Sequence, residues 1–269
     1  MAGTPRPPTA LVTGASSGIG RELARQLVVD RGYTVLATAR RLDRLEALAS
    51  ELPAGRIIPM AGDLADEAFR ARLWAAAEAL PGGLDVLINN AGVGHYDDFA
   101  DQDPARWRQI IEVNQVALFD FTARAIRHMR PRRSGQIVAI SSVLGFVGLP
   151  YSAAYVASKH AVNGLIKSLH YELRGSGVRA WAACPNRTES EFHGVALQRE
   201  PTRSGFAEPT AVVARAILRG LDRRRTFWLP TWPAWAVVTA ERVLPGPFEW
   251  VMGRWAPGHF RKEIERGRN

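Results

Sequence analysis

Tyr155 and Lys159 stand four residues apart in the segment Tyr-Val-Ala-Ser-Lys. If this segment is helical, the two side chains lie on one face, with Cβ atoms about 5–6 Å apart. An ammonium at that distance favours the phenolate and lowers the tyrosine pKa from its ordinary value of about 10. Such a pair can exchange a proton near neutral pH, as reduction of a carbonyl requires. The same spacing also arises by chance on solvated helices, so a function needs a cofactor site beside the pair.

A glycine-rich turn near the N-terminus offers such a site. The apolar run 9–13 predicts a buried strand, and the pattern that begins at Arg21 predicts a helix. Between them lies Gly14-Ala-Ser-Ser-Gly-Ile-Gly20. A turn of this kind lets the backbone approach a pyrophosphate, whose charge then sits at the helix N-terminus. The alternative is a structural glycine turn, because the spacing differs from the common dinucleotide fingerprint.

Five motifs, taken together and in order, resemble those of the short-chain dehydrogenase/reductase family. They are Thr13-Gly-Ala-Ser-Ser-Gly-Ile-Gly20, Asn89-Asn-Ala-Gly92, Asn114, Ser142 and Tyr155-x3-Lys159. The resemblance covers roughly residues 9–230. It implies a single α/β domain with a Rossmann-type doubly wound parallel sheet of about seven strands, with helices on both faces.

The resemblance also implies roles for individual residues. Ser142 would hydrogen-bond the substrate oxygen, Tyr155 would exchange its proton, and Lys159 would hold the nicotinamide ribose. Asn114 would position a water in the proton relay, and no metal ligand is expected. The residues expected at the NADP(H) site are Gly14, Ser16, Ser17, Gly18, Ile19, Gly20, Arg40, Asp63, Leu64, Asn90, Ala91, Gly92, Tyr155, Lys159, Pro185, Asn186 and Thr188.

Arg40 predicts that the cofactor is NADP(H). After the second strand of such folds, an acidic residue binds the ribose 2′-hydroxyl of NAD, whereas arginine accommodates the 2′-phosphate. Here the strand ends in Ala-Thr-Ala-Arg40-Arg41, and the first carboxylate is Asp43. A guanidinium can bind phosphate through two parallel hydrogen bonds. We therefore assign Arg40 to the phosphate, and leave Arg41 in part and Arg44 wholly to the following helix.

The turn after the sixth expected strand departs from the family pattern. The family usually has Pro-Gly there, and this chain has Pro185-Asn186. Asparagine tolerates positive φ better than most residues, so the backbone turn can survive. We expect its side chain to crowd the nicotinamide carboxamide.

Strand and helix patterns alternate along the chain, which favours a parallel sheet with helices on both faces. The expected strands are 9–13, 33–39, 56–60, 84–89, 135–141, 178–184 and 226–229, and the main expected helices are 42–52, 66–80, 104–130, 155–175 and 209–223. Ligands bind outside the carboxyl ends of such strands. The expected strand ends bring Gly14, Arg40, Asp63, Asn90, Ser142 and Pro185 to one edge.

Composition bounds the remaining possibilities. The 269 residues can bury the core of one α/β domain. The net charge of +9 comes mainly from scattered arginines, and we see no zinc spacing, aromatic RNA-binding signature or basic heptad array that would indicate nucleic acid. The single cysteine, Cys184, allows no internal disulfide, which fits a reducing cytoplasm. Neither a transmembrane run nor the apolar stretch of a signal peptide is expected.

The C-terminal extension, 231–269, is rich in aromatic residues. Five of the eight tryptophans fall at or near it: Trp228, Trp232, Trp235, Trp250 and Trp255. Tryptophan beside arginine suits a membrane interface or the mouth of an apolar pocket. Packing on the core or on a second subunit explains the pattern equally well. The segment loosely resembles the tails of reductases that act on keto-lipids or steroids.

These observations predict an NADPH-dependent reductase of a ketone on an apolar, lipid- or steroid-like substrate. One alternative is an NADP-linked secondary alcohol dehydrogenase, because the reaction is reversible. Another is a cofactor-binding regulatory or scaffold protein, impaired at Asn186. We further expect a cytoplasmic protein, and membrane contact is one of the alternatives for its tail. A homodimer or homotetramer is expected to pair through the helices 104–130 and 155–175.

Overall fold

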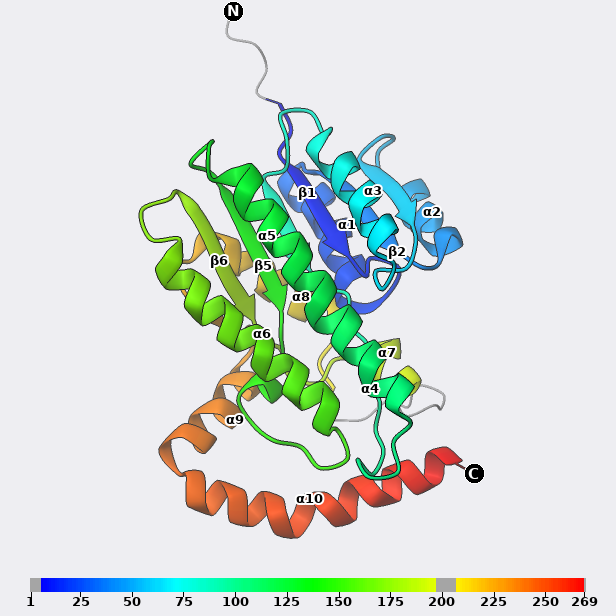
Figure 1. Cartoon of the computed structure of the whole chain (residues 1–269), viewed down its shortest axis with the longest axis vertical. Helices are drawn as coiled ribbons and strands as arrows, with labels where there is room; N and C mark the ends of the chain where they lie inside the picture. Colours follow the sequence, from blue (N-terminus) through cyan, green and yellow to red (C-terminus); the bar gives the residue numbers. More distant parts are fainter. Residues whose placement is uncertain (1–5, 197–206, 269) are drawn as a thin grey trace, which may run out of the picture.

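Seven parallel strands form one sheet in a computed structural model that describes residues 6–196 and 207–268 (Figure 1). The first five residues of the N-terminal segment therefore lie outside it. The strand order is β3-β2-β1-β4-β5-β6-β7, so the chain changes direction across the sheet between β1 and β4. The strands are β1 (Thr9–Thr13), β2 (Thr34–Ala39), β3 (Ile57–Ala61), β4 (Val86–Asn89), β5 (Gly135–Ile140), β6 (Val178–Ala183) and β7 (Phe227–Trp228).

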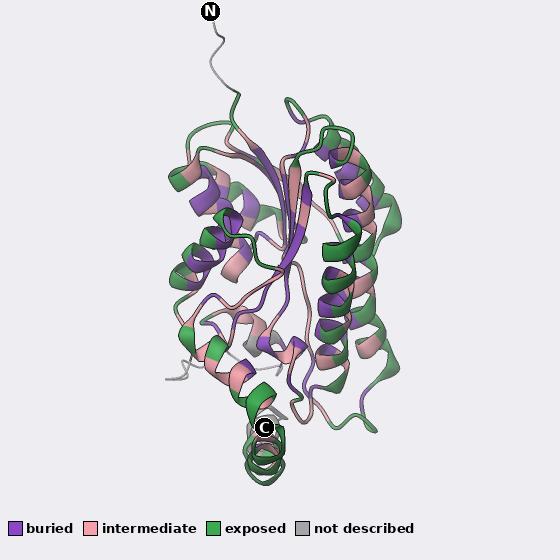
Figure 2. Ribbon diagram, turned by 90° about the vertical axis from the view of Figure 1, so that its left-hand side faces the viewer, coloured by how far each residue is buried: buried purple, intermediate pink, exposed green. Residues whose placement is uncertain are grey.

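Helices cover both faces of the sheet, and the buried strands lie between the two helical layers in Figure 2. One layer holds α1 (Gly18–Arg31), α2 (Leu42–Ser50) and α8 (Thr210–Arg219), and the other holds α3 (Glu67–Glu78), α4 (Pro104–Ile111), α5 (Ala117–Met129) and α6 (Ala153–Glu172). Because both faces are covered, the strands are almost continuously apolar. The expected doubly wound α/β fold is confirmed.

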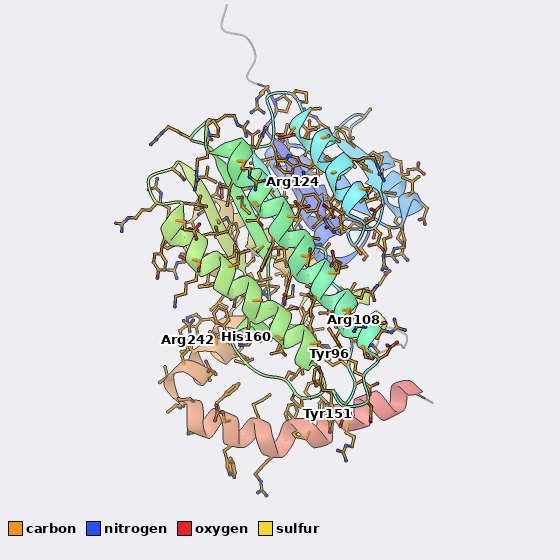
Figure 3. The ribbon with its side chains drawn as sticks, in the orientation of Figure 1. Tyr96, Arg108, Arg124, Tyr151, His160 and Arg242 are labelled. Atoms are coloured by element: carbon orange, nitrogen blue, oxygen red, sulfur yellow. The ribbon has the colours of Figure 1, made fainter. Side chains whose placement is uncertain are left out.

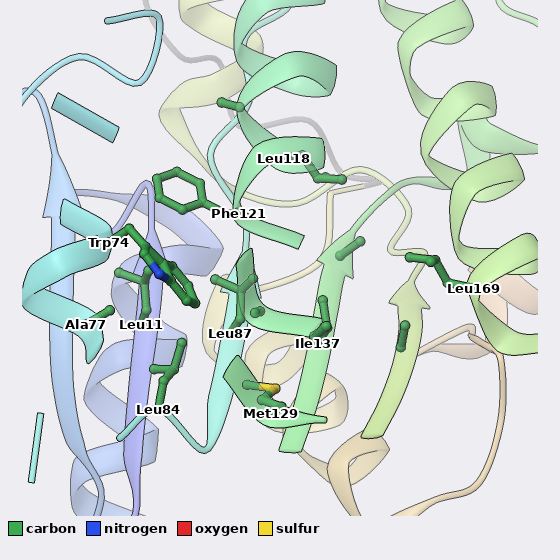
Figure 4. Close-up of a cluster of buried hydrophobic side chains, with 14 of the residues drawn as sticks. Leu11, Trp74, Ala77, Leu84, Leu87, Leu118, Phe121, Met129, Ile137 and Leu169 are labelled. Carbon is green, nitrogen blue, oxygen red and sulfur yellow. The ribbon is translucent and has the colours of Figure 1, made fainter. Parts of the chain in front are cut away.

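Alternation along the strands divides the core into two apolar clusters. Leu11 faces the layer of α3, α5 and α6, whereas its neighbour Val12 faces the layer of α1, α2 and α8. Figure 4 shows the first cluster, in which Trp74 of α3 and Phe121 of α5 lie over the strands. These clusters hold the carboxyl ends of the strands in fixed register, and the candidate site residues follow those ends.

The expected helix 104–130 forms, with one irregular turn inside it. A π-helical turn, η1 (Glu112–Val116), separates α4 from α5, and it contains Asn114. The expected helix 209–223 likewise ends in a 3-10 turn, η3 (Gly220–Asp222). Another short 3-10 turn, η2 (Val143–Gly145), follows β5 directly.

The sequence did not predict the bounds of three helices that follow β6. They are α7 (Glu191–Ala196), α9 (Trp232–Val243) and α10 (Pro245–Arg268). α9 packs through Ala234 and Val238 against Val143. α10 crosses the end of the domain that lies opposite the N-terminus (Figure 1). Among the helices of the described ranges, none combines the length and the apolar composition that crossing a membrane requires.

Candidate active site

The predicted catalytic trio is brought together at the carboxyl end of β5. Tyr155 and Lys159 lie one turn apart on α6 and are both buried, at 9% and 5% exposure. Ser142 precedes η2, where its Oγ accepts a hydrogen bond from the Leu144 amide at 3.1 Å. The Ser142 side chain and the Tyr155 phenol line the same cavity, and Ser142 opposes the rise of the Tyr155 pKa. Lys159 Nζ lies 5.4 Å from the centroid of the Tyr155 ring.

Burial is the main cause of the pKa shifts of Tyr155 and Lys159. It raises the pKa of Tyr155 well above its ordinary value of 10, with a further rise from Tyr96 and an opposing effect from Ser142. Burial also lowers the pKa of Lys159 to about 8. The expectation of a lowered Tyr155 pKa is therefore wrong, because desolvation of the phenolate outweighs the nearby ammonium. At neutral pH the phenol carries its proton.

The Lys159 ammonium is held by the strand beside it. Its Nζ donates a hydrogen bond to the Ile140 carbonyl at 2.8 Å, at the end of β5. A β-carbon placed on Gly92 would lie 3.8 Å from the same Nζ and 3.4 Å from Asn114 Oδ1. The loop after β4 thus passes within van der Waals distance of both polar groups at Gly92.

Asn114 connects this loop to α6. Its Oδ1 accepts from the Val93 amide at 2.8 Å, and its Nδ2 donates to the Val93 carbonyl at 2.9 Å. The same Nδ2 donates to Ser158 Oγ at 3.0 Å. The side chain is buried, and the irregular η1 turn carries it. Through these hydrogen bonds Asn114 connects the loop after β4 to α6. Its expected role in positioning a water stays a prediction.

One cavity of about 870 Å³ contains almost all of the expected cofactor residues. The exception is Gly20, where a β-carbon would lie only 2.3 Å from the Gly14 carbonyl oxygen. Gly20 therefore permits the close packing of α1 on the turn. Gly14 and Gly18 both have positive φ, at 70° and 55°, a conformation that favours glycine. The cavity extends from this turn past Asp63, Asn90 and Pro185 to the catalytic trio.

Arg41, rather than Arg40, makes the polar contacts at the glycine-rich turn. Its Nη2 donates to Ser16 Oγ at 3.2 Å and to Ser17 Oγ at 3.1 Å. Arg40 is exposed and lines the same cavity. We expected Arg41 to belong in part to the following helix, and the folded arrangement shows that it faces the glycine-rich turn.

The Pro185-Asn186 turn forms without the backbone conformation that glycine would allow. Outside glycine, φ is positive among the described residues only at Arg133 and Tyr151. Asn186 therefore does not need positive φ, contrary to the reason given for its tolerance. The turn is held to the catalytic loop, because the Pro185 carbonyl accepts from the Val143 amide at 3.0 Å. Asn186 lines the cavity, and whether it crowds a nicotinamide stays a prediction.

The other end of the cavity is apolar. The Phe192 ring of α7 lies 5.3 Å from the Tyr155 ring, between centroids. Helices α9 and α10 complete this wall with Val237, Phe248, Met252, Trp255 and Phe260. Arg261 Nε donates to the Tyr151 hydroxyl at 3.2 Å, and Figure 3 shows Tyr151 beside α10. The tail thus forms part of the cavity wall.

Comparison with known proteins identifies the family. The family model described as short chain dehydrogenase matches residues 8–200. An uncharacterized oxidoreductase of Myxococcus xanthus is 34% identical over 89% of this chain and 93% of its own length. The chain therefore belongs to the short-chain dehydrogenase family of oxidoreductases, as the resemblance of its motifs implied.

Two further relatives bear on the chemistry. A 3beta-hydroxysteroid dehydrogenase of Mediterraneibacter gnavus is 38% identical over 67% of this chain and 66% of its own length. A short-chain dehydrogenase from Sphingobium yanoikuyae, solved in complex with NADPH, has a TM-score of 0.78 and 30% identity, and the match covers 88% of this chain and 93% of that one. These similarities support a nicotinamide-dependent oxidoreductase.

Proposed function

We propose that this protein is an NADPH-dependent reductase of a ketone on an apolar substrate. One observation carries the proposal: a single cavity joins the glycine-rich turn and Arg41, through Ser142, Tyr155 and Lys159, to an apolar wall. The polar part fits a dinucleotide, because the positive-φ glycines bring backbone close to a bound phosphate. The apolar part fits a hydrocarbon framework.

The residues of the trio have separate tasks in this reaction. Ser142 and Tyr155, which line the same part of the cavity, hold the carbonyl oxygen, and Tyr155 donates its proton to it. Lys159 supplies a charge beside them and holds the nicotinamide ribose. NADPH, when bound, supplies the hydride. At neutral pH the phenol carries the proton that reduction requires, whereas the reverse reaction, alcohol oxidation, would need the phenolate.

The preference for NADPH rests on the residues that follow β2. Arg40 and Arg41 both line the cavity there, and no carboxylate stands between Ala39 and Asp43. Guanidinium groups in this place suit a 2′-phosphate, whereas NAD binding uses a carboxylate. The NADPH complex of the Sphingobium yanoikuyae relative supports the same choice.

The substrate class follows from the cavity wall and from one relative. Aliphatic and aromatic side chains of α9 and α10 border the catalytic end, so an extended apolar ketone gains contact there. The similarity to a 3beta-hydroxysteroid dehydrogenase supports a substrate of steroid-like or lipid-like size. The test is NADPH consumption with a panel of ketones, from acetone to long-chain and steroidal ketones. We expect kcat/KM to rise with apolar size, and no consumption with any ketone would refute the proposal.

The outer surface of the tail has the features of a site that contacts a membrane, where an apolar substrate is found. Trp232, Trp235 and Trp250 are 78%, 59% and 66% exposed, and the Arg254 guanidinium lies 5.6 Å from the centroid of the Trp250 ring. Exposed tryptophan beside arginine suits the interface of an anionic bilayer, and the net charge of +9 favours the same partner. We propose that α9 and α10 rest on such a surface and that the protein is peripheral to it.

A further inference from the structure

A carboxylate of α7 occupies the arginine pair at the glycine-rich end of the cavity. Arg41 Nη1 lies 3.0 Å from Glu191 Oε2, and Arg44 Nη1 lies 2.5 Å from Glu191 Oε1. The same Arg41 guanidinium donates to the hydroxyls of Ser16 and Ser17. Glu191 therefore pairs with both guanidiniums that adjoin the phosphate-binding turn and offsets one of their two positive charges. The two arginines in turn lower the pKa of Glu191, with Arg44 contributing most, so the carboxylate is ionised at neutral pH.

The residues on either side of Glu191 contact opposite ends of the cavity. A β-carbon on Gly18 would lie 3.2 Å from the Ser190 Cβ, so the chain passes directly over the glycine-rich turn. Phe192, the next residue, reaches the other end, where its ring lies 5.3 Å from the Tyr155 ring. A β-carbon on Gly94 would lie 2.9 Å from Phe192 Cζ. Adjacent residues of α7 thus contact the phosphate end and the catalytic end.

We propose that Glu191 is an internal competitor of the 2′-phosphate of NADPH, and that this phosphate releases α7 by displacing Glu191 from Arg41 and Arg44. This inference rests on the proposed function, because it takes the cofactor to be NADPH. A phosphate and the Glu191 carboxylate need the same guanidinium donors, and they repel each other. A dinucleotide without the 2′-phosphate leaves the ion pairs intact. Glu191 therefore moderates the preference for NADPH that the arginines provide, and it links the phosphate end to the position of Phe192 beside Tyr155.

The direct test is the affinity of the Glu191→Gln variant for cofactors and for a fragment. Isothermal titration with NADPH, NADH and adenosine 2′-monophosphate reports binding without turnover. The ion pairs are partly exposed, so the gain from removing the competitor is modest. We expect Glu191→Gln to tighten NADPH and adenosine 2′-monophosphate about three- to tenfold and to leave NADH within twofold. Glu189→Gln, an exposed carboxylate two residues away, is the matched control and should change none of the three.

A second variant shows whether the effect acts through Arg41. In an Arg41→Gln background, the gain in NADPH affinity from Glu191→Gln should shrink, because one of the two contested guanidiniums is gone. An NADPH affinity that Glu191→Gln leaves unchanged or weakens would overturn the inference, even if the wild type binds and consumes NADPH. Suppose that no ketone in the panel supports NADPH consumption by the wild type, yet adenosine 2′-monophosphate still binds more tightly to Glu191→Gln. The proposed reaction is then refuted, and the competition is supported.

Discussion

At the scale of single residues, the proposed chemistry depends on Tyr155 and Lys159, which are buried together at the carboxyl end of β5. The four-residue interval placed Tyr155 and Lys159 on one face of α6, as expected. The sequence could not show that both side chains are buried, and this burial reverses the expected shift of the Tyr155 pKa. The sequence placed Arg41 only in part at the cofactor site for a similar reason. Its contacts with Ser16 and Ser17 depend on how the loop after β2 lies against the glycine-rich turn.

The proton donor is tested by Tyr155→Phe. The variant keeps the ring and loses only the phenolic hydroxyl, so we expect turnover of ketones to fall by about 10²–10⁴-fold, the usual span for a general acid. NADPH affinity, measured by titration, should stay within about threefold. Tyr151→Phe is the matched control, because that hydroxyl contacts Arg261 of α10. Equal losses of turnover in both variants would show that Tyr155 is not the proton donor.

The pH dependence of reduction follows from the same two groups. We expect kcat/KM to be flat from pH 6 to about 8, since Tyr155 keeps its proton, and to fall above pH 8 as Lys159 loses its charge. Unfolding is not the cause of that fall. The pKa of Lys159 is below its ordinary value of 10.5, so the cost of burying the ammonium is fully present below pH 8 and is relieved as the pH rises. A rate that stays constant to pH 10 would contradict the assignment.

At the scale of elements, the strands were predictable and the irregular or tail helices were not. Buried strands of a parallel sheet are continuous apolar runs, so β1 and β6 stand out in the sequence. The η1 turn departs from ordinary helical periodicity without any proline or glycine to mark it. α10 contains Pro257 and several glycines, which oppose helix formation. One face of α10 lines the cavity through Met252 and Phe260, and helix propensities do not reveal this packing.

Two alanine variants test the roles of the two faces of α10 separately. Met252 lines the cavity, whereas Trp250 is exposed on the helix. We expect Met252→Ala to lower kcat/KM for a long-chain ketone more than for acetone, because each lost methylene contact forfeits about 0.8 kcal/mol. Trp250→Ala should leave both rates unchanged and weaken co-sedimentation with anionic liposomes. Wild-type protein that stays in the supernatant would refute the membrane contact, and an equal loss with both ketones would refute the substrate wall.

At the scale of the whole molecule, the expected oligomer is the least constrained part of the prediction. The outer sides of η1 and α5 expose Val116 and Phe119, at 39% and 40%. We propose that this surface pairs two copies about a twofold axis, the commonest assembly of soluble proteins. Light scattering should then give a dimer or tetramer, and Phe119→Glu should shift it towards 29.6 kDa. Wild-type protein that has this monomer mass at micromolar concentration would contradict the pairing.

The most direct test of the proposed reaction follows one atom. With NADPH deuterated at the transferred position of the nicotinamide and an apolar ketone, mass spectrometry of the alcohol reports where the deuterium goes. We predict one deuterium in the alcohol product, formed by the wild type and nearly lost in Tyr155→Phe. NADPH that binds the protein while no ketone yields a deuterated alcohol would contradict an NADPH-dependent ketone reductase.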